Sequence, residues 1–336
     1  MREKTMIIAW CYGSGPWVFP SGFRERRCLS WQSRKLNLTL MAVRVNPMDE
    51  AVRWIEAHLD EGKARRSEAA GASGWASMGK VEMDSGKRFF VKTSGRPAEA
   101  MFLGEAEGLR AMHATRTITV PNAYHVADTD NGSYIIMDYL DMRGRCDAAL
   151  LGRRLAEMHL AQPSAAEARS GQFGFPVKNT IGGTPQPNPW TDNWVDFFRE
   201  HRLGFQLRLA RDTTLSELGK KLMRKLDQYF VDIDIQPAIL HGDLWSGNMG
   251  VLDSGEPVIF DPASYYGHHE AEFGMSWCAG FGSDFHQAYH DIIPRAPGFE
   301  DRHRIYQLYH YLNHYNLFGG GYYNSALSIL QSLTNE

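Results

Sequence analysis

The pattern of apolar and polar residues becomes regular at residue 46. Over 46–62 a proline and early acidic residues open the pattern, and Val52, Ile55 and Leu59 then recur at helical spacing. Over 96–115 another proline opens a stretch in which apolar residues return every three or four positions. Both patterns predict helices that turn one face towards a core.

Short apolar runs separated by turn signals surround the second of these helices. Residues 71–93 predict a small-residue turn, a strand, a tight Asp-Ser-Gly turn and a second strand that ends on Lys92. Residues 120–128 and 132–140 predict two more strands, with an Asn-Gly pair between them that is typical of a hairpin. An antiparallel sheet is therefore expected before residue 140.

The remainder of the chain is predicted to be mainly helical. Helices are expected over 148–161, up to about residue 230, and over 305–318 and 325–330, with an ordered loop over 173–194 and a strand over 257–261. We therefore expect an α+β fold with two lobes and a cleft between them. The divisions are an N-terminal extension (1–45), an N-lobe with a small antiparallel sheet and one long helix (46–140), and a larger, mainly helical C-lobe (141–336).

The segment "HGDLWSGN" at 241–248 contains more polar chemistry than a turn requires. Asp243 and Asn248 stand five positions apart, and the next predicted strand ends on Asp261. This is the layout of a phosphotransferase loop, in which one acid accepts a hydroxyl proton while an amide and a second acid hold magnesium. Mg²⁺ requires such hard oxygen ligands, and an attacking alcohol requires a proton acceptor.

The predicted N-lobe contains residues suited to ATP. Lys92 would reach the phosphates, and Glu105 in the following helix would hold that lysine as an ion pair. The small-residue turn would surround the phosphates, and the end of the last strand would meet the adenine. The candidate nucleotide residues in these two segments are Gly71, Ser73, Gly74, Met137, Asp138, Tyr139 and Leu140.

Each of these residues also has a simpler interpretation, as an Asx turn, a strand end or a solvated ion pair. His241 is expected to be a structural hydrogen-bonding residue, and His159 a satisfied core residue. A stripe of mostly aromatic residues on the last long helix is expected to pack in the core rather than bind a cofactor; it comprises Tyr306, Tyr309, His310, Asn313 and Leu317. The catalytic interpretation rests on the ordered set rather than on any one member.

Composition narrows the class of protein further. The chain is 43% hydrophobic, with a formal net charge of -3 and no basic stripe, so a nucleic-acid partner is not expected. No apolar run approaches the roughly 18 residues of a membrane span. The four cysteines lie far apart, which favours neither a zinc site nor a disulfide framework.

The first 48 residues are rich in arginine and contain few acids. This composition resembles an organellar transit peptide. The alternatives are a tail without periodic structure or a start codon placed ahead of Met41, either of which fits a cytoplasmic protein. We expect residues 1–40 to be dispensable for folding.

The quoted segments together resemble the fructosamine-3-kinase and ketosamine-3-kinase family. The resemblance runs from about Pro47 to the C-terminal helix and includes "LHGDLWSGN", "VIFDPASYYGHHEAEFGMS" and "FGFPVKNTIGGTPQPN". It is closest to the plant-type members, which favours a chloroplast transit peptide at the start of the chain, and it implies a protein-kinase-like fold. It also implies ATP-dependent phosphorylation of the 3-hydroxyl of ketosamines, on small molecules or glycated proteins, which leads to deglycation.

The resemblance also assigns roles to residues. It implies that Asp243 is the catalytic base, that Asn248 and Asp261 bind Mg²⁺, and that Lys92 and Glu105 hold the ATP phosphates. A further hypothesis is that Trp245 stacks on the sugar or its linker.

One departure from the family concerns the nucleotide loop, which in many members contains a cysteine. Here Gly74 stands at the matching position and bulky Trp75 follows it. We therefore expect no disulfide dimer through this loop, since neither Cys146 nor Cys278 is expected to reach it. The oligomeric state stays open. Two alternative functions also stay open, a kinase of another small alcohol such as an aminoglycoside or amino sugar, and a kinase-fold protein that binds without turnover.

Overall fold

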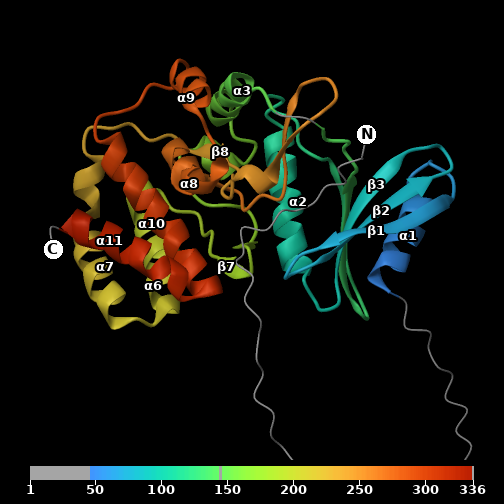
Figure 1. Ribbon diagram of the computed structural model, residues 1–336, viewed down its shortest axis with the longest axis horizontal. Helices are drawn as coiled ribbons and strands as arrows, with labels where there is room; N and C mark the ends of the chain where they lie inside the picture. The colour runs from blue at the N-terminus through green and yellow to red at the C-terminus, as the bar shows by residue number, and fades with distance from the viewer. Residues whose placement is uncertain (1–45, 144–145, 335–336) are drawn as a thin grey trace, which may run out of the picture.

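The computed structural model describes residues 46–143 and 146–334. The predictions for residues 1–45 fall outside these ranges. The described chain forms two lobes, which lie side by side with α2 next to the boundary between them (Figure 1). No helix in the two described ranges is long and apolar enough to cross a membrane.

The N-lobe is built on a five-stranded antiparallel sheet. Its strands, in spatial order, are β1 (Ala64–Ala72), β2 (Ser77–Met83), β3 (Arg88–Ser94), β5 (Gly132–Asp138) and β4 (Ala123–Thr129). Two helices accompany the sheet, α1 (Pro47–His58) and α2 (Glu99–His113). The Asn46 side chain begins α1 by accepting a hydrogen bond from the backbone N–H of Met48. The predicted sheet, both helices and the Asn-Gly hairpin are confirmed.

Strand β1 was not predicted, and residues 71–72 belong to this strand rather than to the turn. Its sequence, ARRSEAAGA, has no alternation of apolar and polar residues, and none of its side chains is fully buried. It is one of the two edge strands of the sheet, held by backbone pairing with β2 rather than by buried side chains. A pattern based on hydrophobicity does not detect such a strand.

The two faces of the sheet belong to different hydrophobic clusters, because successive strand residues point to opposite faces. One face packs under α1 in a small cluster that includes Ile55 and Val91. The other face packs against α2, and its cluster includes Phe90 and Leu109. This second cluster continues without a break into the C-lobe, where it includes Ile239 and Tyr306.

The C-lobe is mainly helical, as predicted. Its longer helices are α3 (Ala148–Leu160), α6 (Gly204–Ala210), α7 (Thr213–Lys225), α9 (Ser283–His290), α10 (Phe299–Phe318) and α11 (Tyr323–Thr334). Short helices are α4 (Ala166–Arg169), α5 (Trp194–Phe198) and α8 (Ser276–Ala279), with a π-helical segment at Arg199–Leu203 and 3-10 turns at Leu226–Phe230, Ser246–Asn248, His269–Met275 and Gly320–Tyr322. On α10 four residues of the predicted stripe are buried, Tyr306, Tyr309, His310 and Asn313, whereas Leu317 is half-buried.

Three small two-stranded sheets complete the C-lobe. β8 (Ala238–Leu240) pairs with β11 (Tyr265–Gly267), and β9 (Met249–Val251) pairs with β10 (Pro257–Ile259). The third pair, β6 (Asn179–Ile181) and β7 (Thr184–Gln186), is a hairpin inside the segment predicted to be a loop. Its strands are too short to produce a periodic pattern, which is why the sequence did not reveal them.

Candidate active site

A cleft of about 590 Å³ lies between the lobes. All of the predicted site residues except Gly71 line it. Gly71 is paired with Met78 inside the β1–β2 ladder, so the predicted turn contributes Ser73 and Gly74 but not Gly71. The fold therefore brings together residues that are far apart in the sequence, such as Ser73 and Asp261.

The loop that follows β8 is organised by His241. Its ring Nε2 lies 2.9 Å from the carbonyl oxygen of Phe260, and its Nδ1 accepts a hydrogen bond of 3.2 Å from the backbone N–H of Asp243. These partners correspond to the neutral ring with its proton on Nε2. Burial lowers the pKa of His241, although Glu272 opposes this shift. The prediction that His241 is structural is confirmed.

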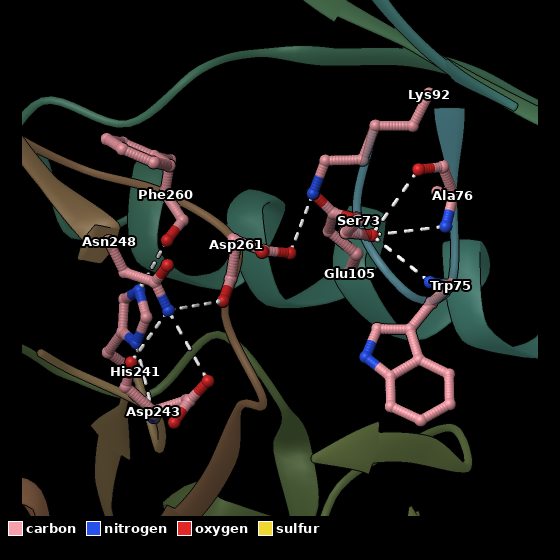
Figure 2. A network of polar contacts seen from close by, with 10 residues as sticks. All are labelled: Ser73, Trp75, Ala76, Lys92, Glu105, His241, Asp243, Asn248, Phe260 and Asp261. Carbon is pink, nitrogen blue, oxygen red and sulfur yellow. Dashed lines mark hydrogen bonds and ion pairs between the residues drawn. The ribbon is translucent and has the colours of Figure 1, made fainter. Parts of the chain in front are cut away.

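Asp243 and Asn248 face each other across this loop (Figure 2). The Asn248 amide nitrogen donates to the Asp243 carbonyl oxygen at 2.9 Å and lies 3.4 Å from one of its carboxylate oxygens. The amide nitrogen is thus engaged with Asp243, and the amide oxygen is the atom that Asn248 could offer to a cation. Burial, followed by the charges of Asp261 and Glu272, raises the pKa of Asp243 to about 7. A carboxyl group with that pKa is suited to proton transfer near neutral pH.

Asp261 lies between Asn248 and Lys92 (Figure 2). One of its carboxylate oxygens is 2.6 Å from Lys92 Nζ, and its backbone is left-handed, with φ of 60°. Non-glycine residues seldom adopt this conformation, and Asn and Asp do so more readily than others. The side chain is 51% exposed, so it opens onto the cleft.

Lys92 also contacts Glu105, at 2.7 Å, which confirms that the two residues form a buried ion pair. Burial acts against the charge of Lys92, but Asp261 and Glu105 outweigh it and raise the pKa of the lysine. Burial also raises the pKa of Glu105, against the attraction of Lys92. The pair is therefore buried in the cleft wall. The simpler interpretation, a solvated ion pair, is wrong.

The end of β5 provides an apolar wall. Met137 is buried, and Met78, Phe90 and Phe102 line the cleft with it. The Asp138 carboxylate turns elsewhere, to Lys87, Tyr124 and the backbone N–H of Asn122. Any contact of Asp138 with a nucleotide would therefore involve its backbone.

The Ser73 turn is held by its own hydrogen bonds. Ser73 Oγ accepts from the backbone N–H groups of Trp75 and Ala76, at 3.2 and 3.1 Å. Because this hydroxyl organises the turn, the turn has a defined shape despite its small residues. Figure 2 shows the Trp75 indole projecting from it.

Glu272 is a residue that the sequence analysis missed. Its buried carboxylate accepts from the backbone N–H groups of His241 and Gly242, at 2.7 and 3.0 Å. His159 lies 3.3 Å from the same carboxylate through Nε2 and 2.7 Å from the Tyr289 hydroxyl through Nδ1. His159 is thus a satisfied core residue, as predicted. The signal in the sequence was an acid placed inside the mostly apolar run "AEFGMSW", because acids are almost never buried in a core unless they are paired.

Trp245 lines the cleft two residues after Asp243. Its indole lies on Gly247, where a Cβ atom would be only 2.2 Å from the ring. The position is compatible with the predicted stacking role.

The fold and the matching solved structures define the class as kinase-like. A crystal structure of a candidate fructosamine-3-kinase from Thermobifida fusca matches with a TM-score of 0.73 and 27% identity, covering 85% of this chain and 98% of that one. A variant of the aminoglycoside phosphotransferase APH(4)-Ia, in complex with AMP-PNP and hygromycin B, matches with a TM-score of 0.58 and 14% identity, covering 85% and 98%. At that identity the second match concerns the fold alone.

The family follows from the sequence comparisons. The fructosamine kinase family model matches residues 48–336. The chain is 48% identical to the chloroplastic protein-ribulosamine 3-kinase of Arabidopsis thaliana, covering 87% of this chain and 89% of the relative. It is 40% identical to the ketosamine-3-kinase of Mus musculus, covering 75% and 90%. The chain belongs to the fructosamine kinase family.

Proposed function

We propose that this protein transfers the γ-phosphoryl group of ATP to the 3-hydroxyl of ketosamines. The observation that supports the proposal most directly is the convergence of Asp243, Asn248, Asp261 and Lys92 in one cleft of a fructosamine kinase family member. Phosphorylation of glycated amines in this way would initiate deglycation, on small molecules or on proteins.

In the proposed reaction the ketosamine oxygen attacks the γ-phosphorus and the bond to the bridging oxygen of ADP breaks. The hydroxyl proton passes to the carboxylate of Asp243, which lies in the cleft with a pKa near neutrality. Lys92, held by Glu105, binds phosphate oxygens. Trp245 offers an aromatic face to the sugar or its linker.

The donor set fits magnesium. The Asn248 amide oxygen and the Asp261 carboxylate are hard ligands at the same wall of the cleft. When bound, Mg²⁺ would neutralise charge on the phosphates. Each of the two residues would contribute one side of that site.

The acids of the cleft argue against an aminoglycoside as the acceptor. Glu105 is paired with Lys92, and Asp138 is engaged with Lys87 and Tyr124. Of the acids that line the described cleft, this leaves Asp243 and Asp261, which the reaction itself requires. A polycation would have no separate carboxylates to bind there.

The test is ATP consumption with a fructosamine, a ribulosamine and an aminoglycoside, measured side by side with identification of the phosphorylated product. We expect phosphorylation of one or both ketosamines and none of the aminoglycoside. Turnover of the aminoglycoside alone would contradict the proposal, and no turnover of any acceptor, with nucleotide bound, would favour the non-catalytic alternative.

We also propose a chloroplast location, because the relatives from Arabidopsis thaliana and rice are named chloroplastic and the leader is arginine-rich. Residues 1–45 fused to a fluorescent protein should direct it to plastids in plant cells. A diffuse cytoplasmic signal from that fusion would support the alternative location.

A further inference from the structure

The Trp75 side chain joins the nucleotide loop to the C-lobe. A Cβ atom on Gly183 would lie 2.4 Å from two atoms of the Trp75 indole, so the ring rests directly on the glycine backbone. Gly183 belongs to the turn between β6 and β7, and Gly182 beside it lines the cleft together with Trp75. The contact therefore crosses the mouth of the cleft.

The β6–β7 hairpin is hydrogen-bonded to the segment that follows Asp261. The Asn179 amide nitrogen donates to the carbonyl oxygen of Ser264 at 2.7 Å, and the Gln186 amide donates to that of Ala263 at 3.0 Å. Both carbonyls lie within three residues of Asp261. The hairpin also packs on α2, where a Cβ on Gly104 would be 2.4 Å from the Asn179 side chain. The turn that receives Trp75 is thus fixed relative to Asp261.

The contact is apolar and partly open. Trp75 is 42% exposed, and neither partner contributes a charge. It consists of one indole ring resting on one glycine turn. A contact of that size can open to admit substrates and close again.

We propose that Trp75 is a positioning residue that docks on the Gly182–Gly183 turn and closes the nucleotide loop over the γ-phosphate. Closure excludes water, so that the acceptor hydroxyl receives the phosphoryl group. When the contact between Trp75 and this turn is lost, a water oxygen attacks the γ-phosphorus instead and the bond to the bridging oxygen of ADP breaks. The water proton passes to Asp243, and inorganic phosphate forms. This inference rests on the proposed kinase function.

Trp75→Ala removes the indole contact and leaves the shape of the turn intact. The hydrogen bonds of Ser73 come from backbone N–H groups, so they survive the substitution. The measurement is the ratio of inorganic phosphate to phosphorylated ketosamine at saturating ATP. We expect this ratio to rise roughly 2- to 10-fold, which corresponds to a change of about 0.4–1.4 kcal/mol in the difference between the two barriers. Trp75→Phe should restore part of the coupling.

Gly183→Val disrupts the same contact from the C-lobe, because the valine Cβ would overlap the Trp75 indole. It should raise the same ratio, and the Trp75→Ala/Gly183→Val double variant should be no worse than either single variant. Gly282→Val, at a glycine with no atom within 4 Å of its Cβ, and Leu160→Ala, at a side chain that is 64% exposed, are the controls and should leave the ratio unchanged.

An unchanged ratio in both single variants, or strictly additive effects in the double variant, would overturn the inference. If Trp75→Ala fails to fold, Gly183→Val and Trp75→Phe decide the question. Failure of the proposed function would look different, since the wild-type protein would then phosphorylate no ketosamine.

Discussion

At the scale of single residues, Asp243 and Asp261 are two acids with different surroundings. Burial and the negative charges of Asp261 and Glu272 raise the pKa of Asp243, although the hydrogen bond from the Asn248 amide opposes this shift. Burial would also raise the pKa of Asp261, but the ammonium group of Lys92 lowers it. The first acid is therefore able to take up a proton near neutral pH, whereas the second stays ionised, as its proposed role as a metal ligand requires.

Asp243→Asn should abolish turnover and leave nucleotide binding largely intact, because the nucleotide contacts other groups. Loss of a general base typically costs roughly 100- to 10,000-fold in rate. Steady-state kinetics and a nucleotide titration measure the two effects separately. Wild-type turnover in this variant would show that Asp243 is not the base.

Substitutions at Asp261 should separate charge from backbone conformation. Asp261→Asn and Asp261→Ala both remove the carboxylate, so nucleotide affinity should fall in magnesium and change little in its absence. Alanine must also adopt φ near 60°, which costs roughly 1–2 kcal/mol, whereas asparagine tolerates it better. Denaturant titration should find the alanine variant less stable than the asparagine variant. Equal nucleotide affinity in magnesium for wild type and both variants would refute the metal role.

At the scale of elements, the loop at 241–248 depends on the 3-10 turn His269–Met275. Glu272 in this turn accepts both backbone N–H groups at the start of the loop. Burial would raise its pKa, but hydrogen bonds from His159 and the backbone outweigh burial and lower it. A carboxylate with a lowered pKa adds stability above its ordinary value of 4.5, and this stability is lost as the pH falls through the folded-state pKa.

Glu272→Gln should therefore destabilise the protein near neutral pH by about 1–3 kcal/mol, since its amide turns a donor towards other donors. The difference from wild type should shrink as the pH falls below 4.5 towards the lowered pKa of the folded state, where the native carboxylate becomes protonated. Urea unfolding at several pH values measures this. Glu300→Gln, at a side chain that is 77% exposed, is the matched control. A pH-independent difference would show that the charge of Glu272 is unimportant.

Elements also show how far the sequence could predict the structure. Helices such as α2 and α10 repeat apolar residues over several turns, so their existence and inward faces were predictable. β1 and the β6–β7 hairpin lack that repetition and depend on backbone pairing or on single amide side chains such as Asn179. The order of Lys92, Glu105, Asp243 and Asp261 indicated one cleft. The partners of Glu272 and the reach of Trp75 arise only from tertiary packing, which spacing along the chain does not encode.

At the scale of the whole molecule, the lobes share one hydrophobic cluster behind the cleft, and α1 covers a separate, smaller one. We expect amide hydrogen exchange to reflect this division. Amides of α1 should exchange through local opening, whereas those of α2 and α10 should be protected alike, up to global unfolding. Mass-spectrometric exchange measured by peptide tests this. If α2 exchanged with α1 rather than with α10, the shared cluster would not unite the lobes.

The unbroken cluster also bears on how such a molecule can be recombined. An N-lobe taken from another kinase would have to supply, on its own α2, a surface that matches the C-lobe side chains around Ile239 and Tyr306. Grafts that stop at the lobe boundary should therefore yield insoluble chimeras more often than grafts confined to α1, whose apolar partners all lie in the sheet beneath it. Helix α1 is therefore the element that we expect to be exchanged between relatives with the least loss of solubility.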